Sequence, residues 1–231
     1  TLTMHDIYTF AKEVEIDDIK ELLDQMIACN TAIAQEGMHG DYGANIGKVI
    51  AIRKDLPGLL KAYAAAGSDA RMNGCELPVV INSGSGNQGL TVSVPLIIYA
   101  EREHLDQEAL YRALVISNLT AIHLKTEIGR LSAFCGAVSA GAACGAGLAY
   151  LKGASEEVMN HTIVNALAIT SGIICDGAKA SCAAKIAVSV EAGILGYDMY
   201  MNGQQFYGGD GIISKGIENT IHNIGVLGSQ G

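Results

Sequence analysis

The stretch LSAFCGAVSAGAACGAGLAYL, residues 131–151, carries no charged residue at any position. Its length could span a bilayer, but most of its residues are Ala, Gly, Ser or Cys and few are strongly apolar. Small residues four positions apart, such as Gly141 and Gly145, let helices approach closely, a pattern that also occurs in membranes. We therefore expect a buried helix inside a tightly packed helical protein rather than a membrane span.

The segments around this stretch also have helical patterns. Asp18-x-x-Glu21 resembles a capping box, apolar residues follow it at helical spacing, and Gly37 suits the end of that helix. Further helices are expected over residues 44–74, with an interruption near Pro57-Gly58, and over 90–103, 106–129, 155–172 and 178–196. Asp106 and Ser155 are expected to cap two of them. The fold class is therefore predicted as mainly α: a compact Ala/Gly-rich helical domain over residues 1–231, with at most a short strand near 77–82.

Composition narrows the possible partners. Hydrophobic residues make up 49% of the 231 positions, charged residues only 17%, and the net charge is −9. Because so few residues are charged, we expect much of the chain to be buried, and therefore a homo-oligomer. The negative charge and the lack of a Lys/Arg cluster argue against a nucleic-acid partner and against an anionic membrane surface. No secretory signal is recognised, and the six cysteines are interpreted as those of a reducing, cytoplasmic protein.

The loop NSGSGNQG, residues 82–89, matches the spacing G-x-G-x-x-G of dinucleotide-binding turns. A Rossmann unit needs a second parallel strand after the helix, whereas residues 101–125 have the pattern of another helix. We instead expect the start of a helix to bind a small carboxylate. The candidate substrate-binding side chains are Ser83, Ser85, Asn87 and Gln88. The alternative is a tight turn whose polar groups satisfy one another.

Three cysteines lie in unusual surroundings. No C-x-x-C occurs, so zinc ribbons, thioredoxin-type pairs and ferredoxin-type carriers lack their usual signatures. Spacing alone leaves Cys135, Cys175 and Cys182 as small core residues. However, Cys175 and Cys182 flank Asp176 and Lys179 in a glycine-containing break between two apolar helices. Polar residues in such a break need an explanation.

Three blocks resemble the iron–sulfur L-serine dehydratase alpha-chain family, and within it the L-cysteine desulfidase branch. They are NSGSGNQGLTVSVPLIIYA (82–100), LSAFCGAVSAG (131–141) and SGIICDGAKASCAAKIAVSVEAG (171–193). The resemblance covers essentially the whole chain. It implies a [4Fe–4S] cluster held by three cysteines, which fall on Cys135, Cys175 and Cys182. The remaining cysteines have no counterpart and are interpreted as packing residues: Cys29, Cys75 and Cys144.

The resemblance also implies the chemistry. Three ligands for four irons leave one iron with an open position, where it acts as a Lewis acid on the β-substituent. A base removes the α-proton of L-cysteine or L-serine, and pyruvate and ammonia result. No pyridoxal phosphate is needed. Lys125, Lys179 and Lys185 are interpreted as surface or carboxylate-pairing residues, and Lys179, beside a ligand, is the candidate for substrate binding.

Members of this family are longer at the N-terminus, and the base that the resemblance implies has no match here. We therefore expect a fragment of a longer chain that holds the cluster ligands and part of the substrate pocket. Two alternatives remain: a non-catalytic cluster- or ligand-binding fragment, and a helical protein whose cysteines only fill the core. The first interpretation requires residues 83–89 to lie near the three cysteines.

Overall fold

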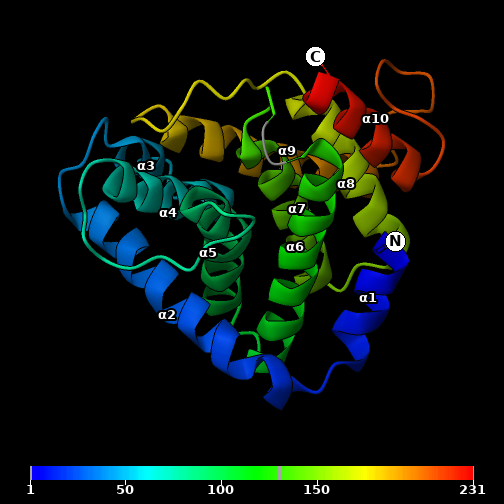
Figure 1. The fold of residues 1–231 in the computed structure, drawn as a ribbon. Coiled ribbons are helices and arrows are strands. Elements are labelled where there is room, and N and C mark those ends of the chain that lie inside the picture. The colour runs from blue at the N-terminus through cyan, green and yellow to red at the C-terminus, as the bar shows by residue number, and fades with distance from the viewer. Residues whose placement is uncertain (1, 130–131, 231) are drawn as a thin grey trace.

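Ten α-helices and no β-strand form the part of the chain that this computed structural model describes, residues 2–129 and 132–230. In chain order the helices are α1 (Met4–Glu13), α2 (Ile16–His39), α3 (Ile46–Ala51), α4 (Leu56–Met72), α5 (Gly86–Arg102), α6 (Gln107–Ile128), α7 (Gly136–Leu151), α8 (Glu156–Thr170), α9 (Cys182–Met201) and α10 (Ile217–Gln230) (Figure 1). The mainly α fold is confirmed. Residues 77–82 form neither a helix nor a strand, and Asn82 makes only an isolated bridge with Ser85.

Helix α7 lies at the centre of the molecule, where it packs against α5, α6, α8 and α9 (Figure 1). All of its residues from Ala137 to Ala149 are buried. The uncharged stretch is thus a core helix, as expected, although it begins at Gly136, and Leu131 lies outside the described residues. Among the described helices, none is both long and apolar enough to cross a membrane.

Glycines let α7 and α9 touch backbone to backbone. A Cβ atom on Gly141 would lie 2.3 Å from the carbonyl oxygen of Ser189, and one on Gly145 would lie 2.8 Å from the Cα of Gly193. Since real Cβ atoms do not approach other atoms so closely, only glycine fits at these two positions of α7. The two contacts advance in the same direction along both helices, so α7 and α9 run parallel and begin at the same end.

The boundaries of α2 differ from the prediction. The helix begins at Ile16 after Glu15, so Asp18 lies in its first turn and is not its cap. There the carboxylate still favours the positive helix end. Gly37 does not end the helix either but is buried within it. Glycine is needed at this position, because a Cβ there would lie 1.9 Å from the carbonyl oxygen of Ala66. The helix continues to His39.

The later boundaries follow local signals more closely. Asp106 and Ser155 cap α6 and α8 as predicted, with side-chain oxygens that accept the N–H groups of Ala109 and Val158. The range 44–74 is divided into two helices, as the predicted interruption implied. The break lies before Pro57, which is in the first turn of the second helix, where proline is tolerated. The helix predicted from residue 178 begins only at Cys182.

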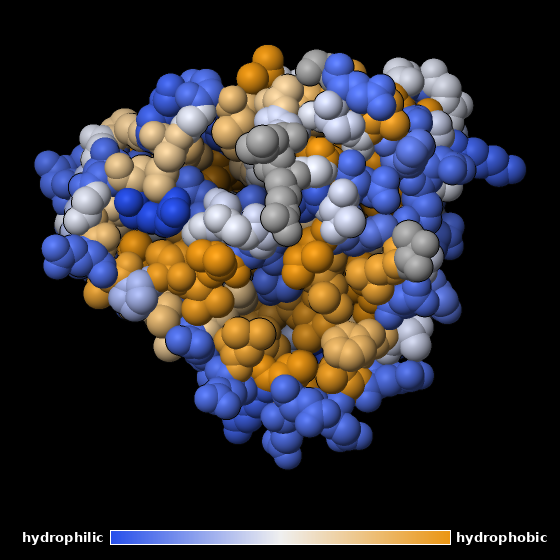
Figure 2. All heavy atoms as spheres, viewed as in Figure 1, coloured by the Kyte–Doolittle hydropathy of each residue, from blue (hydrophilic) through white to orange (hydrophobic). Residues whose placement is uncertain are grey.

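One face of the molecule carries an apolar groove. Figure 2 shows apolar side chains gathered over the region where α2, α5 and α6 lie. A groove of about 480 Å³ there is lined by Ile27, Ile97, Leu105 and Leu110 among others. The homo-oligomer expected from the low charged fraction stays a prediction, and this groove is one apolar surface that such an assembly could cover.

The close contact of α7 with α9 makes a prediction about stability. We expect Gly141→Ala to lower the free energy of unfolding by about 1–3 kcal/mol, because the new methyl group forces the two helices apart. Gly172→Ala is the control: a Cβ there meets nothing within 4 Å, so the change should stay within about 0.5 kcal/mol. Urea denaturation followed by circular dichroism measures both. Equal losses would contradict the tight contact.

Candidate functional site

A two-residue turn shapes the start of the glycine loop. Asn82 and Ser85 exchange both backbone hydrogen bonds, with N···O distances of 3.1 and 3.0 Å. Between them Ser83 and Gly84 have φ values of 49° and 79°, which is the geometry of a type I′ turn. The buried Asn82 donates to the backbone and side-chain oxygens of Asn118. The turn is therefore held firmly against α6.

The three glycines of the G-x-G-x-x-G spacing have separate structural roles. Gly84 supplies the positive φ of the turn. A Cβ on Gly86 would lie 2.3 Å from Nε of Arg71, and one on Gly89 would lie 2.1 Å from the carbonyl oxygen of Val80. The spacing is thus explained by one turn and two close contacts, without a nucleotide.

Pairing of two extended segments brings Cys135 and Cys175 close to each other. The N–H of Cys135 donates to Ile173 O at 3.0 Å, and the N–H of Cys175 donates to Ala133 O at 2.8 Å. These bonds flank a single antiparallel bridge between Phe134 and Ile174. Cysteines 40 positions apart in the sequence thus lie on neighbouring segments, because the chain returns to the same place after α7 and α8.

Cys135 and Cys182 stand at the beginnings of helices. Cys135 is the residue before α7, and Cys182 is the first residue of α9. Because α7 and α9 run parallel, both helix starts lie at one end of the bundle. Burial raises the pKa of the Cys135 thiol, whereas the backbone N–H of Ala137 lowers it. The Sγ of Cys182 accepts the N–H of Lys179 at 3.5 Å.

One cavity of about 410 Å³ unites the two sequence features. The glycine loop contributes Ser83, Ser85, Asn87 and Gln88 to its lining, and the cysteine segments contribute Cys135, Cys175 and Cys182. Residues in the first turns of α5, α7 and α9 line it, so three positive helix ends open into the same space. The closeness that the sequence interpretation required is therefore present.

Lys179, in contrast, is not part of this lining. Its Nζ lies 3.3 Å from Asp176 Oδ2, and its side chain is half exposed. Asp176 also pairs with Lys185, which donates to Ile174 O at 3.0 Å. Hydrogen bonds from Lys185 and then Lys179 lower the pKa of Asp176 to about 2. Lys185 pairs with a carboxylate as expected, and substrate binding by Lys179 stays a prediction that this position does not support.

Two further cations line the cavity without an anionic partner. Arg71 and Lys125 both belong to its lining, and neither forms an ion pair with another described residue. The interpretation of Lys125 as a carboxylate-pairing residue is thus not seen here. Burial lowers its pKa, while the nearby thiols of Cys175 and Cys135 act in the opposite direction. Sequence reasoning missed Arg71, because nothing in α4 marks it as a neighbour of the loop.

Gln88 has an unusual environment in this cavity. Its side chain is 6% exposed, and its Oε1 is buried with no hydrogen-bond partner among the described residues. The amide packs against Gly136, where a Cβ would lie 2.6 Å from Gln88 Cδ. A buried acceptor without a donor costs free energy. The wall of the cavity therefore contains a buried acceptor that no described residue satisfies.

No group of three His, Cys, Asp or Glu side chains converges closely enough, within the described ranges, to hold a single metal ion. The three cysteines share the cavity but do not form such a compact group. A metal cluster differs in this respect, because its protein ligands bind different metal atoms and stand apart. The structure therefore gives no support to a mononuclear site.

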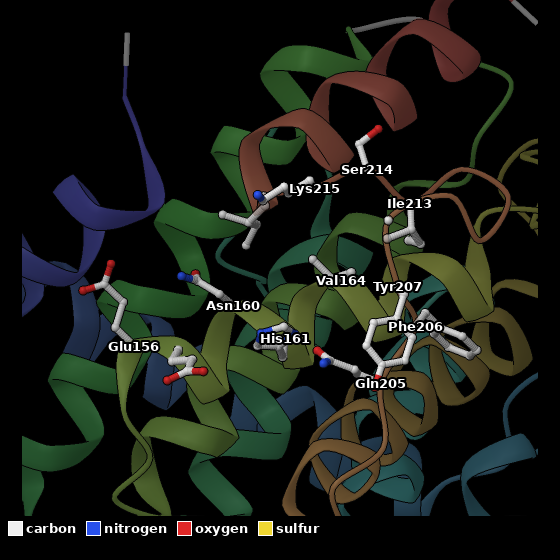
Figure 3. A pocket seen from close by; sticks show the side chains of 14 residues that line it. Glu156, Asn160, His161, Val164, Gln205, Phe206, Tyr207, Ile213, Ser214 and Lys215 are labelled. Carbon is white, nitrogen blue, oxygen red and sulfur yellow. The ribbon is translucent and has the colours of Figure 1, made fainter.

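A second cavity, of about 540 Å³, lies between α8 and residues 205–217 (Figure 3). None of the cysteines or loop residues lines it. Its acidic groups already have partners: Glu157 accepts the hydroxyl of Tyr200 at 2.8 Å, and Glu156 lies 3.2 Å from Nδ1 of His5. The cavity beside the cysteines, with its unpaired cations and unsatisfied acceptor, is the stronger candidate.

Comparisons with known proteins agree with the sequence blocks. The profile of the family described as serine dehydratase alpha chain matches residues 3–231. UPF0597 proteins are similar over the whole chain: that of Desulfitobacterium hafniense is 62% identical, that of Finegoldia magna 50% and that of Treponema denticola 48%. The chain covers 54% of the first and 55% of the other two, about half the length of each. No solved structure matches. The chain belongs to the serine dehydratase alpha chain family.

Proposed function

We propose that this chain is the cluster- and substrate-binding part of a lyase. The reaction is β-elimination from L-cysteine, giving pyruvate, ammonia and sulfide, or from L-serine, giving pyruvate and ammonia. Membership of the family supports a dehydratase-type lyase. The observation that supports this location of the active site is that the glycine loop and the three cysteines line one cavity together.

The donor set fits an iron–sulfur cluster. Cys135, Cys175 and Cys182 all face one cavity, and cysteine thiolates are the usual ligands of such clusters. Cys135 and Cys182 stand at positive helix ends, which favour thiolates. Lys125 and Lys185 lie close to these thiols and act in the same way. We therefore assign the three cysteines as ligands of a [4Fe–4S] cluster.

The elimination has two bond-breaking steps. The Cα–H bond and the bond from Cβ to sulfur or oxygen break, and a Cα=Cβ double bond forms. Water then replaces the nitrogen, so that pyruvate and ammonia are released. When bound, an iron with an open position would supply a Lewis acid for the departing thiolate or hydroxyl. The loop side chains Ser83, Ser85, Asn87 and Gln88 hold and orient the amino acid. The base that takes the α-proton is not assigned to this chain.

A second candidate is a cluster- or ligand-binding unit without turnover of its own. It is favoured by one observation: the chain spans about half the length of its relatives. Residues that complete the reaction can therefore lie elsewhere in the complete protein. The two candidates differ in product formation, which only the first requires.

We predict that anaerobic reconstitution with iron and sulfide loads the wild-type chain. Cys135→Ala, Cys175→Ala and Cys182→Ala should each lower bound iron and acid-labile sulfide sharply, because each removes a ligand. Cys29→Ala is the matched control, since Cys29 does not line the cavity. Cluster loading should also protect the three cysteines, but not Cys29, from alkylation as read by mass spectrometry. Ligand variants that retain full iron and sulfide would show the assignment to be wrong.

We also predict that the complete protein, reconstituted with its cluster, releases sulfide and pyruvate in equal amounts from L-cysteine under anaerobic conditions. Release of pyruvate from L-serine, compared as kcat/KM, decides which substrate is preferred. Coupled assays for pyruvate and a colorimetric assay for sulfide measure both. A cluster-loaded complete protein that releases neither product would leave the binding unit as the function.

A further inference from the structure

Arg71 is fixed over the start of helix α5. It belongs to the last turn of α4, and its guanidinium lies where a side chain on Gly86 would be: a Cβ there would lie 2.3 Å from Nε and 2.9 Å from Cζ. Its Nη1 donates to Asn87 Oδ1 at 3.3 Å. The absence of a side chain at position 86 is thus what admits the guanidinium to the loop.

This guanidinium has no counterion among the described residues, although it is always charged. It lies beside the positive end of α5, where Ser85 Oγ accepts the N–H of Gln88. The N–H groups of Gly86 and Asn87 remain without intrahelical partners. A half-buried cation and a positive helix end in one place favour an anion. The planar fork of arginine matches a carboxylate with two parallel hydrogen bonds.

Gln88 restricts the kind of anion. Gln88 is only 6% exposed and lines the same cavity, and its Oε1 has no donor among the described residues. A sulfate ion, a halide or a simple carboxylate at Arg71 would bring no donor for this oxygen. An α-amino acid brings one, because its ammonium group is attached to the carbon that carries the carboxylate. The two groups thus match the two halves of one zwitterion.

We infer that Arg71 and the start of α5 bind the α-carboxylate of an α-amino acid, and that Gln88 Oε1 accepts a hydrogen bond from its ammonium group. The inference rests on the proposed function and names the residues that select the substrate class. An amino acid held by both α-groups at the loop leaves its β-substituent free to face the thiols of Cys135, Cys175 and Cys182, which line the rest of the cavity.

Binding of unreactive ligands to the complete protein tests this without turnover. L-Alanine carries both α-groups and no leaving group, and L-alaninamide lacks the negative charge. Titration calorimetry should show that wild type binds L-alanine at least about tenfold more tightly than L-alaninamide. Arg71→Gln should remove that preference and leave L-alaninamide binding unchanged. Arg71→Lys, which keeps the charge and loses the fork, should give an intermediate preference.

The matched control is Arg102→Gln, because Arg102 lies in the last turn of the neighbouring helix α5, is exposed and does not line the cavity. It should bind L-alanine as wild type does. Gln88→Met removes the acceptor with little change of size, and it should weaken L-alanine but not propionate, which lacks the ammonium group. Circular dichroism confirms that each variant is folded.

The outcomes separate this inference from the proposed function. If Arg71→Gln binds L-alanine as tightly as wild type, or wild type shows no saturable binding of L-alanine, the inference is wrong even when elimination is observed. If the preference for L-alanine depends on Arg71 but no elimination occurs, the inference stands and the lyase does not. Binding of propionate as tight as that of L-alanine would remove the role of Gln88.

Discussion

The backbone contact between α7 and α9 is the constraint on which the site depends. Gly141 and Gly145 on α7 leave no room for side chains against Ser189 and Gly193 on α9. The two parallel helices are therefore held at one separation, and their starts are held at one end of the bundle. Cys135 precedes the first helix and Cys182 begins the second. The packing of small residues in the core thus sets the place of two thiols at its edge.

The cavity beside the cysteines is lined by positive groups that no nearby carboxylate neutralises. Three helix starts, Arg71 and Lys125 direct positive potential into it, whereas the nearby Lys179 and Lys185 are both paired with Asp176. Such a space favours anionic ligands. The two unpaired cations lie at different parts of the cavity: Lys125 is near the thiols of Cys135 and Cys175, whereas the guanidinium of Arg71, from α4, contacts the glycine loop at Asn87. This division suits a reaction in which one end of the substrate is held while the other reacts.

The family and the structure contribute different parts of the functional argument. The family profile covers nearly the whole chain, but the related UPF0597 proteins have names that state no substrate. The structure adds an arrangement: one cavity, an unsatisfied amide oxygen and an unpaired guanidinium. Together they narrow a family-level role to a proposed class of ligand, an α-amino acid, and to residues that can be tested individually.

The sequence by itself determined the features whose causes are local. Helix class follows from periodicity, and the caps Asp106 and Ser155 follow from the residues beside them, because a cap bonds within its own turn. The cysteine blocks likewise carried the family resemblance. Only the tertiary structure decided the rest. Gly37 lies inside a helix and serves the close contact of that helix with the backbone of Ala66. The guanidinium of Arg71 reaches the site because Gly86 has no side chain in its place. These contacts join residues of different helices, and no local pattern records a neighbour that the fold supplies.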